Sequence, residues 1–187
     1  MELNDALNLA SAQFESVLNQ VTESELALAT PCEKWSVEQL VWHVARGSLM
    51  TVRLVDGCSQ AEAKDIMRSP VQPEVVDECR RALAAQMVAL NGADLEQTAH
   101  HPIGDVTVGQ LYDFRIMDVT LHTWDLARAL GADEQLAPEL VAHTYGVLSP
   151  MEPFIGQIGI FGAGPSGTLD GDADLQATLL DLSGRRP

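Results

Sequence analysis

Four long segments of the chain repeat apolar residues at steps of three and four positions, the period of a helix that buries one face. Such a helix must bury its apolar stripe against another element, and no alternating strand pattern recurs that could supply a sheet. The sequence therefore predicts an all-α fold, an up-and-down four-helix bundle formed as one domain by residues 1–187, with a short C-terminal extension. We predict the main helices near residues 2–21, 36–54, 74–90 and 107–130.

Residues that begin and end helices support these boundaries. Ser36 stands three residues before Gln39, as in a capping box; Thr107 is a suitable N-cap, and Gly131 follows the longest apolar stripe. Shorter helices are expected after Pro138 and over residues 175–182. Loops are expected over residues 57–73, 98–105 and 151–171, the last with at most a short strand. The core should contain Leu7, Phe14, Leu40, Val44, Leu83, Met87, Leu111 and Leu121.

The charge and the cysteines exclude several classes of function. The 27 acidic and 11 basic residues give a formal net charge of −16, so the surface repels nucleic-acid phosphates and anionic membranes. No apolar run is long enough to span a bilayer and the acidic N-terminal segment does not resemble a signal peptide, so we expect a cytoplasmic protein. Cys32, Cys58 and Cys79 contain no C-x-x-C pair and have no evident basic partner, so we expect no disulfide, no cysteine zinc site and no cysteine nucleophile.

Two histidines and one aspartate are the residues best suited to chemistry. Asp118 and His122 are four residues apart in the longest predicted helix, so their Cβ atoms lie about 5–6 Å apart on one face. His43 lies in an apolar stretch of the second predicted helix and should face the bundle interior, where polar groups need partners. These residues could form an open three-ligand metal site. A plain hydrogen bond between Asp118 and His122 is the alternative interpretation.

Other charged residues lie close to this set in the sequence. Asp125, three residues beyond His122, could orient its imidazole or form a salt bridge elsewhere. Arg46 and Arg115 each lie three residues from a candidate ligand and could hold an anionic substrate or form ion pairs. The remaining histidines are expected on the surface or in satisfied positions; they are His100, His101 and His143.

Two separated motifs resemble a known family. Residues 30–47, TPCEKWSVEQLVWHVARG, resemble the T-P-C-x-x-W-x-V-x-x-L-x-x-H segment of the DinB-like metal-binding superfamily, in the branch that contains mycothiol-dependent maleylpyruvate isomerase. Residues 118–131, DVTLHTWDLARALG, resemble the second signature of that branch, and the ending LLDLSGRRP is similar to the close of its short members. The resemblance implies a DinB-like four-helix bundle with a divalent metal held by His43, Asp118 and His122. Asp118 stands where the isomerase has a glutamate.

The resemblance also implies a chemistry. A divalent metal would bind a small thiol and deprotonate it, and the thiolate would then attack a small electrophile in a transfer or an isomerisation. Zinc is the first choice for this metal, with nickel and iron as alternatives. The implied cosubstrate is mycothiol, and the catalytic group is a metal-bound thiol or water rather than an identified side chain. We expect no counterpart of the isomerase's additional C-terminal domain, so maleylpyruvate is not carried over as the substrate. A metal-hydroxide hydrolase and a non-catalytic metal-binding protein stay open, as does a homodimer.

Overall fold

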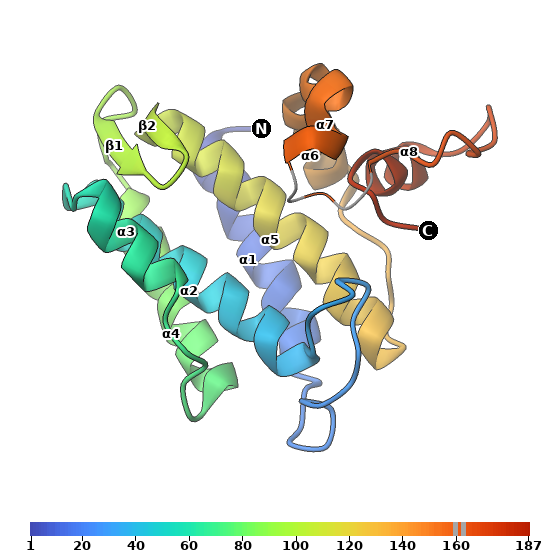
Figure 1. The fold of residues 1–187 in the computed structure, drawn as a ribbon, viewed down its shortest axis with the longest axis horizontal. Helices are drawn as coiled ribbons and strands as arrows, with labels where there is room; N and C mark the ends of the chain where they lie inside the picture. The colour runs from blue at the N-terminus through green and yellow to red at the C-terminus, as the bar shows by residue number, and fades with distance from the viewer. Residues whose placement is uncertain (159–160, 162–163) are drawn as a thin grey trace.

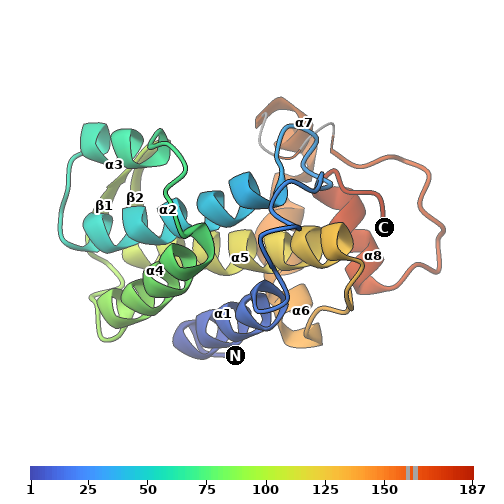
Figure 2. The ribbon, with the colours of Figure 1, turned by 90° about the horizontal axis from the view of Figure 1, so that it is seen from below.

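Four long helices dominate the structure, a computed structural model that describes residues 1–158, 161 and 164–187. They are α1 (Leu3–Leu18), α2 (Val37–Val55), α4 (Val75–Leu90) and α5 (Val108–Leu130). Helix α2 packs mainly against α4 and α1 mainly against α5, while α2 and α5 also contact each other. Figures 1 and 2 show these helices side by side, with the C-terminal helices to one side. The prediction of a mainly helical protein is confirmed.

Local sequence explains where these helices begin and end. Ser36 and Thr107 cap α2 and α5 in capping boxes, the first of them with Gln39 as predicted. Helix α5 ends at Gly131, whose φ of 65° is a left-handed conformation that a residue without a Cβ adopts at little cost. Helix α1 ends at Leu18, earlier than the predicted end at residue 21.

The prediction of loops over residues 57–73 and 98–105 is wrong in part. Residues Gln60–Met67 form helix α3, which begins with a capping box between Ser59 and Glu62 that the sequence displays as S-x-x-E. Strands β1 (Thr98–His101) and β2 (Gly104–Thr107) form an antiparallel hairpin. Each strand has only four residues, which is too short for an alternating pattern to stand out from a loop.

The C-terminal part adds short helices beside α5. Helices α6 (Pro138–Leu148) and α8 (Leu175–Leu182) confirm the two shorter helices that the sequence predicts. The segment expected as a loop over residues 151–171 instead begins with the 3₁₀ helix η1 (Ser149–Phe154) and helix α7 (Ile155–Ile158). Residues 159–160 and 162–163 of that segment lie outside the described residues.

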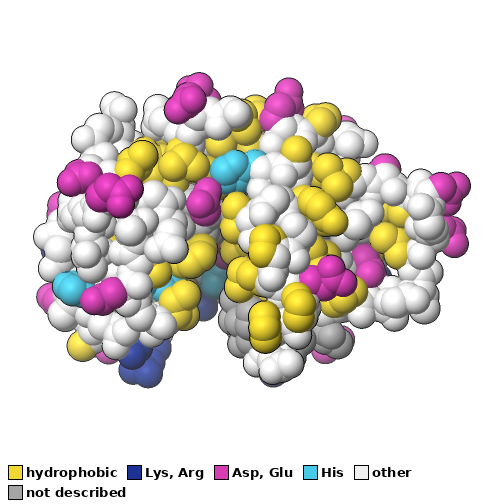
Figure 3. All heavy atoms as spheres, turned by 90° about the horizontal axis from the view of Figure 1, so that it is seen from above, with side chains coloured by type: hydrophobic (Ala, Val, Ile, Leu, Met, Phe, Trp, Pro, Cys, Tyr) yellow, Lys and Arg dark blue, Asp and Glu magenta, His cyan; other side chains and the backbone are white. Residues whose placement is uncertain are grey.

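The apolar stripes of the long helices meet in one core. All of the predicted core residues are buried except Met87, which is partly exposed and packs against the core. A second apolar cluster joins α5 to α6 and α8. In the view from above, acidic side chains are spread over the surface, which fits the negative net charge (Figure 3). Among the described helices, none combines the length and the apolar character needed to cross a membrane.

Candidate metal centre

The T-P-C-x-x-W segment forms a turn just before α2. The Thr30 hydroxyl donates to the carbonyl of Trp35 at 2.9 Å and accepts from the backbone N–H of Cys32 at 3.2 Å. The N–H of Trp35 donates to the carbonyl of Cys32 at 2.7 Å and closes the turn. As a result the Cys32 thiol contacts Asp125 on α5, and the Trp35 ring lies against the imidazole of His43, with centroids 4.5 Å apart.

Helices α2 and α5 bring the three predicted metal ligands together. Nε2 of His43 lies 3.1 Å from Oδ1 of Asp118, and Nε2 of His122 lies 3.5 Å from the same oxygen. The side chains of His43, Asp118 and His122 are 17%, 23% and 9% exposed. The cluster is therefore mostly buried, with Asp118 the most exposed of the three side chains.

The spacing of these atoms fits a divalent metal. In a tetrahedral zinc site with bonds of about 2.0–2.1 Å, ligand atoms are about 3.3 Å apart. The observed separations from Asp118 Oδ1 fall on either side of this value, and one ligand atom from each residue lies within 4.8 Å of the others. Two imidazoles and one carboxylate are also typical of sites that keep a position for water or substrate.

The local charges favour the cation-binding forms of Asp118 and His43 but not of His122. Burial would raise the pKa of the Asp118 carboxyl, but His43, Arg115 and His122 hold this pKa well below its ordinary value. Burial lowers the pKa of His43, so its imidazole stays neutral. Burial opposes protonation of His122, but Asp118 and Asp125 outweigh it and raise the His122 pKa well above the ordinary value. A metal ion bound at this cluster would therefore have to displace a proton from His122.

Arg115 supports Asp118 from inside the protein. Its Nη1 donates to Oδ2 of Asp118 at 2.8 Å, and its side chain is only 5% exposed. Its other N–H groups donate to oxygens of α2 and α4, those of Val44, Ser48 and Gln86. Gly47 makes room for this guanidinium, since a Cβ there would lie 2.3 Å from Nη1. Arg115 is thus fully engaged with protein groups, and we do not propose it as a substrate ligand.

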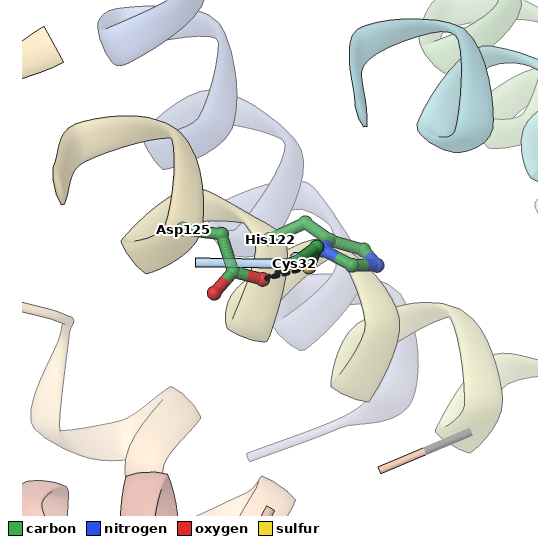
Figure 4. A group of neighbouring side chains, drawn as sticks. All are labelled: Cys32, His122 and Asp125. Atoms are coloured by element: carbon green, nitrogen blue, oxygen red, sulfur yellow. Dashed lines mark hydrogen bonds and ion pairs between the residues drawn. The ribbon is translucent and has the colours of Figure 1, made fainter. Parts of the chain in front are cut away.

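Asp125 is completely buried and is surrounded by donors. Nδ1 of His122 donates to its Oδ2 at 2.8 Å, and Arg185 donates to both carboxylate oxygens, at 2.9 Å through Nε and 2.5 Å through Nη2. The Cys32 thiol lies 3.4 Å from Oδ2. Figure 4 shows the Asp125 carboxylate directed at Cys32 and at one nitrogen of the His122 ring, while the other nitrogen faces away from Asp125. Asp125 therefore fixes the orientation of the ring that presents Nε2 to Asp118.

Two residues of this centre escaped the sequence analysis. The expectation that no cysteine has a basic neighbour is wrong for Cys32, which lies beside His122 and Arg185. Arg185 reaches Asp125 from the C-terminal segment, 60 residues away in sequence. Gly184 allows that approach: its φ is 78°, and a Cβ there would lie 2.1 Å from the carbonyl oxygen of Phe161. The T-P-C-x-x-W motif, which contains Cys32, was the one sequence feature that pointed to this cysteine. Residue spacing cannot reveal contacts between segments so far apart in the chain.

The remaining candidates from the sequence lie elsewhere. The other histidines have acidic or aromatic neighbours of their own: His100 with Asp105, His143 with Asp113, and His101 with Phe114. Arg46 lies on α2, three residues beyond His43, and lines a small pocket together with Trp35. Only this arginine of the predicted pair is therefore available to a ligand near the centre.

Sequence comparison identifies relatives of most of the chain. Residues 7–127 match the model of a family described as the mycothiol maleylpyruvate isomerase N-terminal domain. Two uncharacterised proteins of Mycobacterium tuberculosis, Rv0738 and MT0763, are each 30% identical to the chain over 134 residues, which is 70% of this chain and 69% of theirs.

Structural comparison gives a consistent fold. The crystal structure of the mycothiol-dependent maleylpyruvate isomerase matches with a TM-score of 0.64 and 17% identity, over 88% of this chain and 74% of that one. A histidine-to-alanine mutant of that enzyme matches over the same shares with a TM-score of 0.65 and 16% identity. At this level of identity, the likeness establishes a common fold.

Proposed function

Because this chain belongs to the family of the mycothiol maleylpyruvate isomerase N-terminal domain, we propose that it is a metal-dependent enzyme that uses a small thiol, mycothiol first, to isomerise or conjugate a small electrophile. The observation that carries the proposal is the convergence of His43, Asp118 and His122 on one point at ligand spacing. The solved mycothiol-dependent maleylpyruvate isomerase, which shares this fold, supports the choice of thiol.

The three side chains would hold the metal through Nε2 of His43, Oδ1 of Asp118 and Nε2 of His122. Zinc is our first choice, with nickel and iron as alternatives, because two imidazoles and a carboxylate suit all three metals. A divalent metal bound there lowers the pKa of a coordinated thiol and so supplies a thiolate at neutral pH.

The protein's own residues orient the ligands and limit the access of water. Arg115 occupies Oδ2 of Asp118 and thereby keeps Oδ1 turned toward the histidines. Asp125 accepts from Nδ1 of His122, so the Nε2 lone pair is the one available to a cation. The Trp35 ring lies 4.5 Å from the ring of His43 and 5.7 Å from that of His122, so it shields the cluster on one side.

Further parts of the proposal concern the whole chain. We propose that residues 1–187 form one DinB-like domain, since α6 packs on both α5 and α8. We also propose that it acts in the cytoplasm, where thiol cosubstrates stay reduced. We propose the thiol and the electrophile as its partners, and neither nucleic acid nor membrane. A homodimer is compatible with this site.

Metal content tests the site. The purified protein is dialysed against metal-free buffer and reconstituted with zinc. Elemental analysis should then find one equivalent of zinc per chain. The variants His122→Ala and His43→Ala should lose it while keeping their helical circular dichroism spectrum, and Asp118→Asn should bind more weakly. His143→Ala is the matched control, because His143 also pairs with an aspartate, Asp113, at 3.0 Å. If both ligand variants reconstitute like the unchanged protein, the metal site is refuted.

A second experiment tests the thiol. In the cobalt-substituted protein, saturating mycothiol should shift the visible absorption of the metal, because a thiolate ligand adds a charge-transfer band. Replacing the three cysteines by serine should leave this response intact, which shows that the added thiol rather than a protein thiol causes it. A spectrum that mycothiol leaves unchanged refutes thiol dependence and favours the hydrolase or the non-catalytic metal protein.

A further inference from the structure

Arg46 is a cation without an anionic partner. In the part of the chain that the structure describes, each of the other eight arginines forms an ion pair with a carboxylate within 4.0 Å. Arg46 forms no such pair among the described residues, and its Nε is buried without a hydrogen-bond partner there. Asp118, the carboxylate whose charge acts on the pKa of Arg46, is already paired with Arg115 and the two histidines. A partly buried guanidinium without a counter-charge costs free energy, and because Arg46 lines a cavity, this position favours binding of an anion there.

Arg46 lines a hollow beside the metal centre. The hollow has a volume of about 180 Å³ and lies between α2 and the segment that joins α3 to α4. Trp35 and Trp42 form part of its lining, and Nε1 of Trp42 donates to the carbonyl of Ser69, another lining residue, at 3.0 Å. Since Arg46 follows His43 by three residues, the hollow lies one helical turn from a metal ligand.

An apolar groove adjoins this hollow. Trp42 and Ser69 line both cavities. The groove runs between α2, α3 and α4, has a volume of about 470 Å³, and is lined mainly by apolar side chains, among them Leu49, Val52, Ile66 and Ala85. This volume falls within the range of about 300–1,000 Å³ that is typical of small-molecule sites. Arg53 also lines the groove, but it is paired with Glu62 at 3.8 Å. The two cavities together therefore offer one cation without a carboxylate partner, Arg46, and a mainly apolar groove.

We infer that these adjoining cavities bind a small amphipathic carboxylate, with its carboxylate on Arg46 and its apolar chain along Trp42 in the groove. A carboxylate matches the fork of N–H donors in a guanidinium, and burial of the chain removes apolar surface from water. A cationic ligand is repelled by Arg46, and a short polar anion leaves the groove empty. Binding itself does not need the metal. The identification of this acid as the electrophile of the metal centre rests on the proposed function.

Calorimetric titration with octanoate tests the binding site directly, in metal-free protein so that a metal cannot hold the carboxylate. Octanoate should bind saturably and quench tryptophan fluorescence, since Trp35 and Trp42 line the cavities. Octanol and acetate should each bind at least about tenfold more weakly, because each lacks one of the two recognised ends. Equal affinity for octanol and octanoate overturns the role of Arg46.

Matched variants separate the two ends of the site. Arg46→Gln should weaken octanoate binding at least about tenfold, whereas Arg81→Gln, which removes the same charge from an exposed pair on α4, should leave it unchanged. Ala85→Trp should fill the groove and abolish binding, whereas Ala84→Trp, at an exposed position outside the cavity lining, should not. Equal effects within either pair overturn the inference.

The outcome can be distinguished from that of the proposed function. Arg46→Gln should keep its zinc content, because Arg46 is not among the ligands. If octanoate fails to bind while zinc and mycothiol bind as expected, only the inference falls. If octanoate binds but the zinc and thiol tests fail, the cavity stands as a binding site and the enzyme proposal falls.

Discussion

Replacing Asp125 by asparagine should destabilise the protein strongly, by about 3–5 kcal/mol, the usual cost of removing one partner of a buried ion pair. Every neighbour of the carboxylate is a donor: Arg185 through two nitrogens, His122 through Nδ1 and Cys32 through its thiol. An asparagine would turn its NH₂ group toward one of these donors. It would also leave the guanidinium of Arg185 buried without a counter-charge.

The size of the effect can be worked from the carboxyl pKa. Burial would raise the pKa of Asp125, but Arg185 and His122 outweigh burial and lower it from 3.8 to about 2. This drop is equivalent to about 2.5 kcal/mol in favour of the ionised form. Because the folded pKa lies below the unfolded one, this stability is fully present above about pH 4 and is lost as the pH falls toward 2. The unpaired Arg185 in the variant adds to the loss at neutral pH.

Urea denaturation of metal-free protein at pH 7, followed by circular dichroism, measures the free energy of unfolding. The control is Glu134→Gln, because Glu134 also forms a two-bond pair with an arginine, Arg128, but at the surface, where such pairs contribute about 0–1 kcal/mol. The double variant Asp125→Asn, Arg185→Gln should recover part of the loss, since no buried charge is then left unpaired. A cost below about 1 kcal/mol for Asp125→Asn, or a cost equal to that of the control, would refute this reasoning.

Three further predictions concern other residues. Gly47→Ala should lower the free energy of unfolding by about 1–3 kcal/mol and weaken zinc binding, because the added Cβ would displace Arg115. Thermal denaturation would measure the loss of stability and zinc titration the loss of affinity. An unchanged zinc affinity would contradict the prediction. Cys79 should resist a disulfide reagent at pH 8 in the folded protein, because it is fully buried and burial raises the pKa of its thiol to about 12. Mass spectrometry of the labelled protein should find Cys32 modified first. Ser36→Ala should cost about 1 kcal/mol by removing the cap of α2, and an unchanged urea midpoint would argue against this role.

The helices were predictable because their signals are local. The apolar stripes, the caps at Ser36 and Thr107 and the stop at Gly131 act within a few residues of each other. The hairpin over residues 98–107 and helix α3 escaped prediction, because short elements provide too few residues for a period to emerge. A search for S-x-x-E would have found the start of α3 at Ser59.

The sequence by itself determined which residues could chelate a metal. Asp118 and His122 share a helix face through their spacing of four, and the apolar stretch around His43 predicted that it faces the same interior. Only the tertiary structure decided what surrounds them. The packing of α2 on α5 brings His43 to 3.1 Å from Asp118, places Arg115 inside and leaves Arg46 unpaired at a cavity. Cys32 and Arg185 join Asp125 across 93 and 60 residues of chain. Such contacts depend on how whole helices and loops pack, and no local pattern encodes that packing.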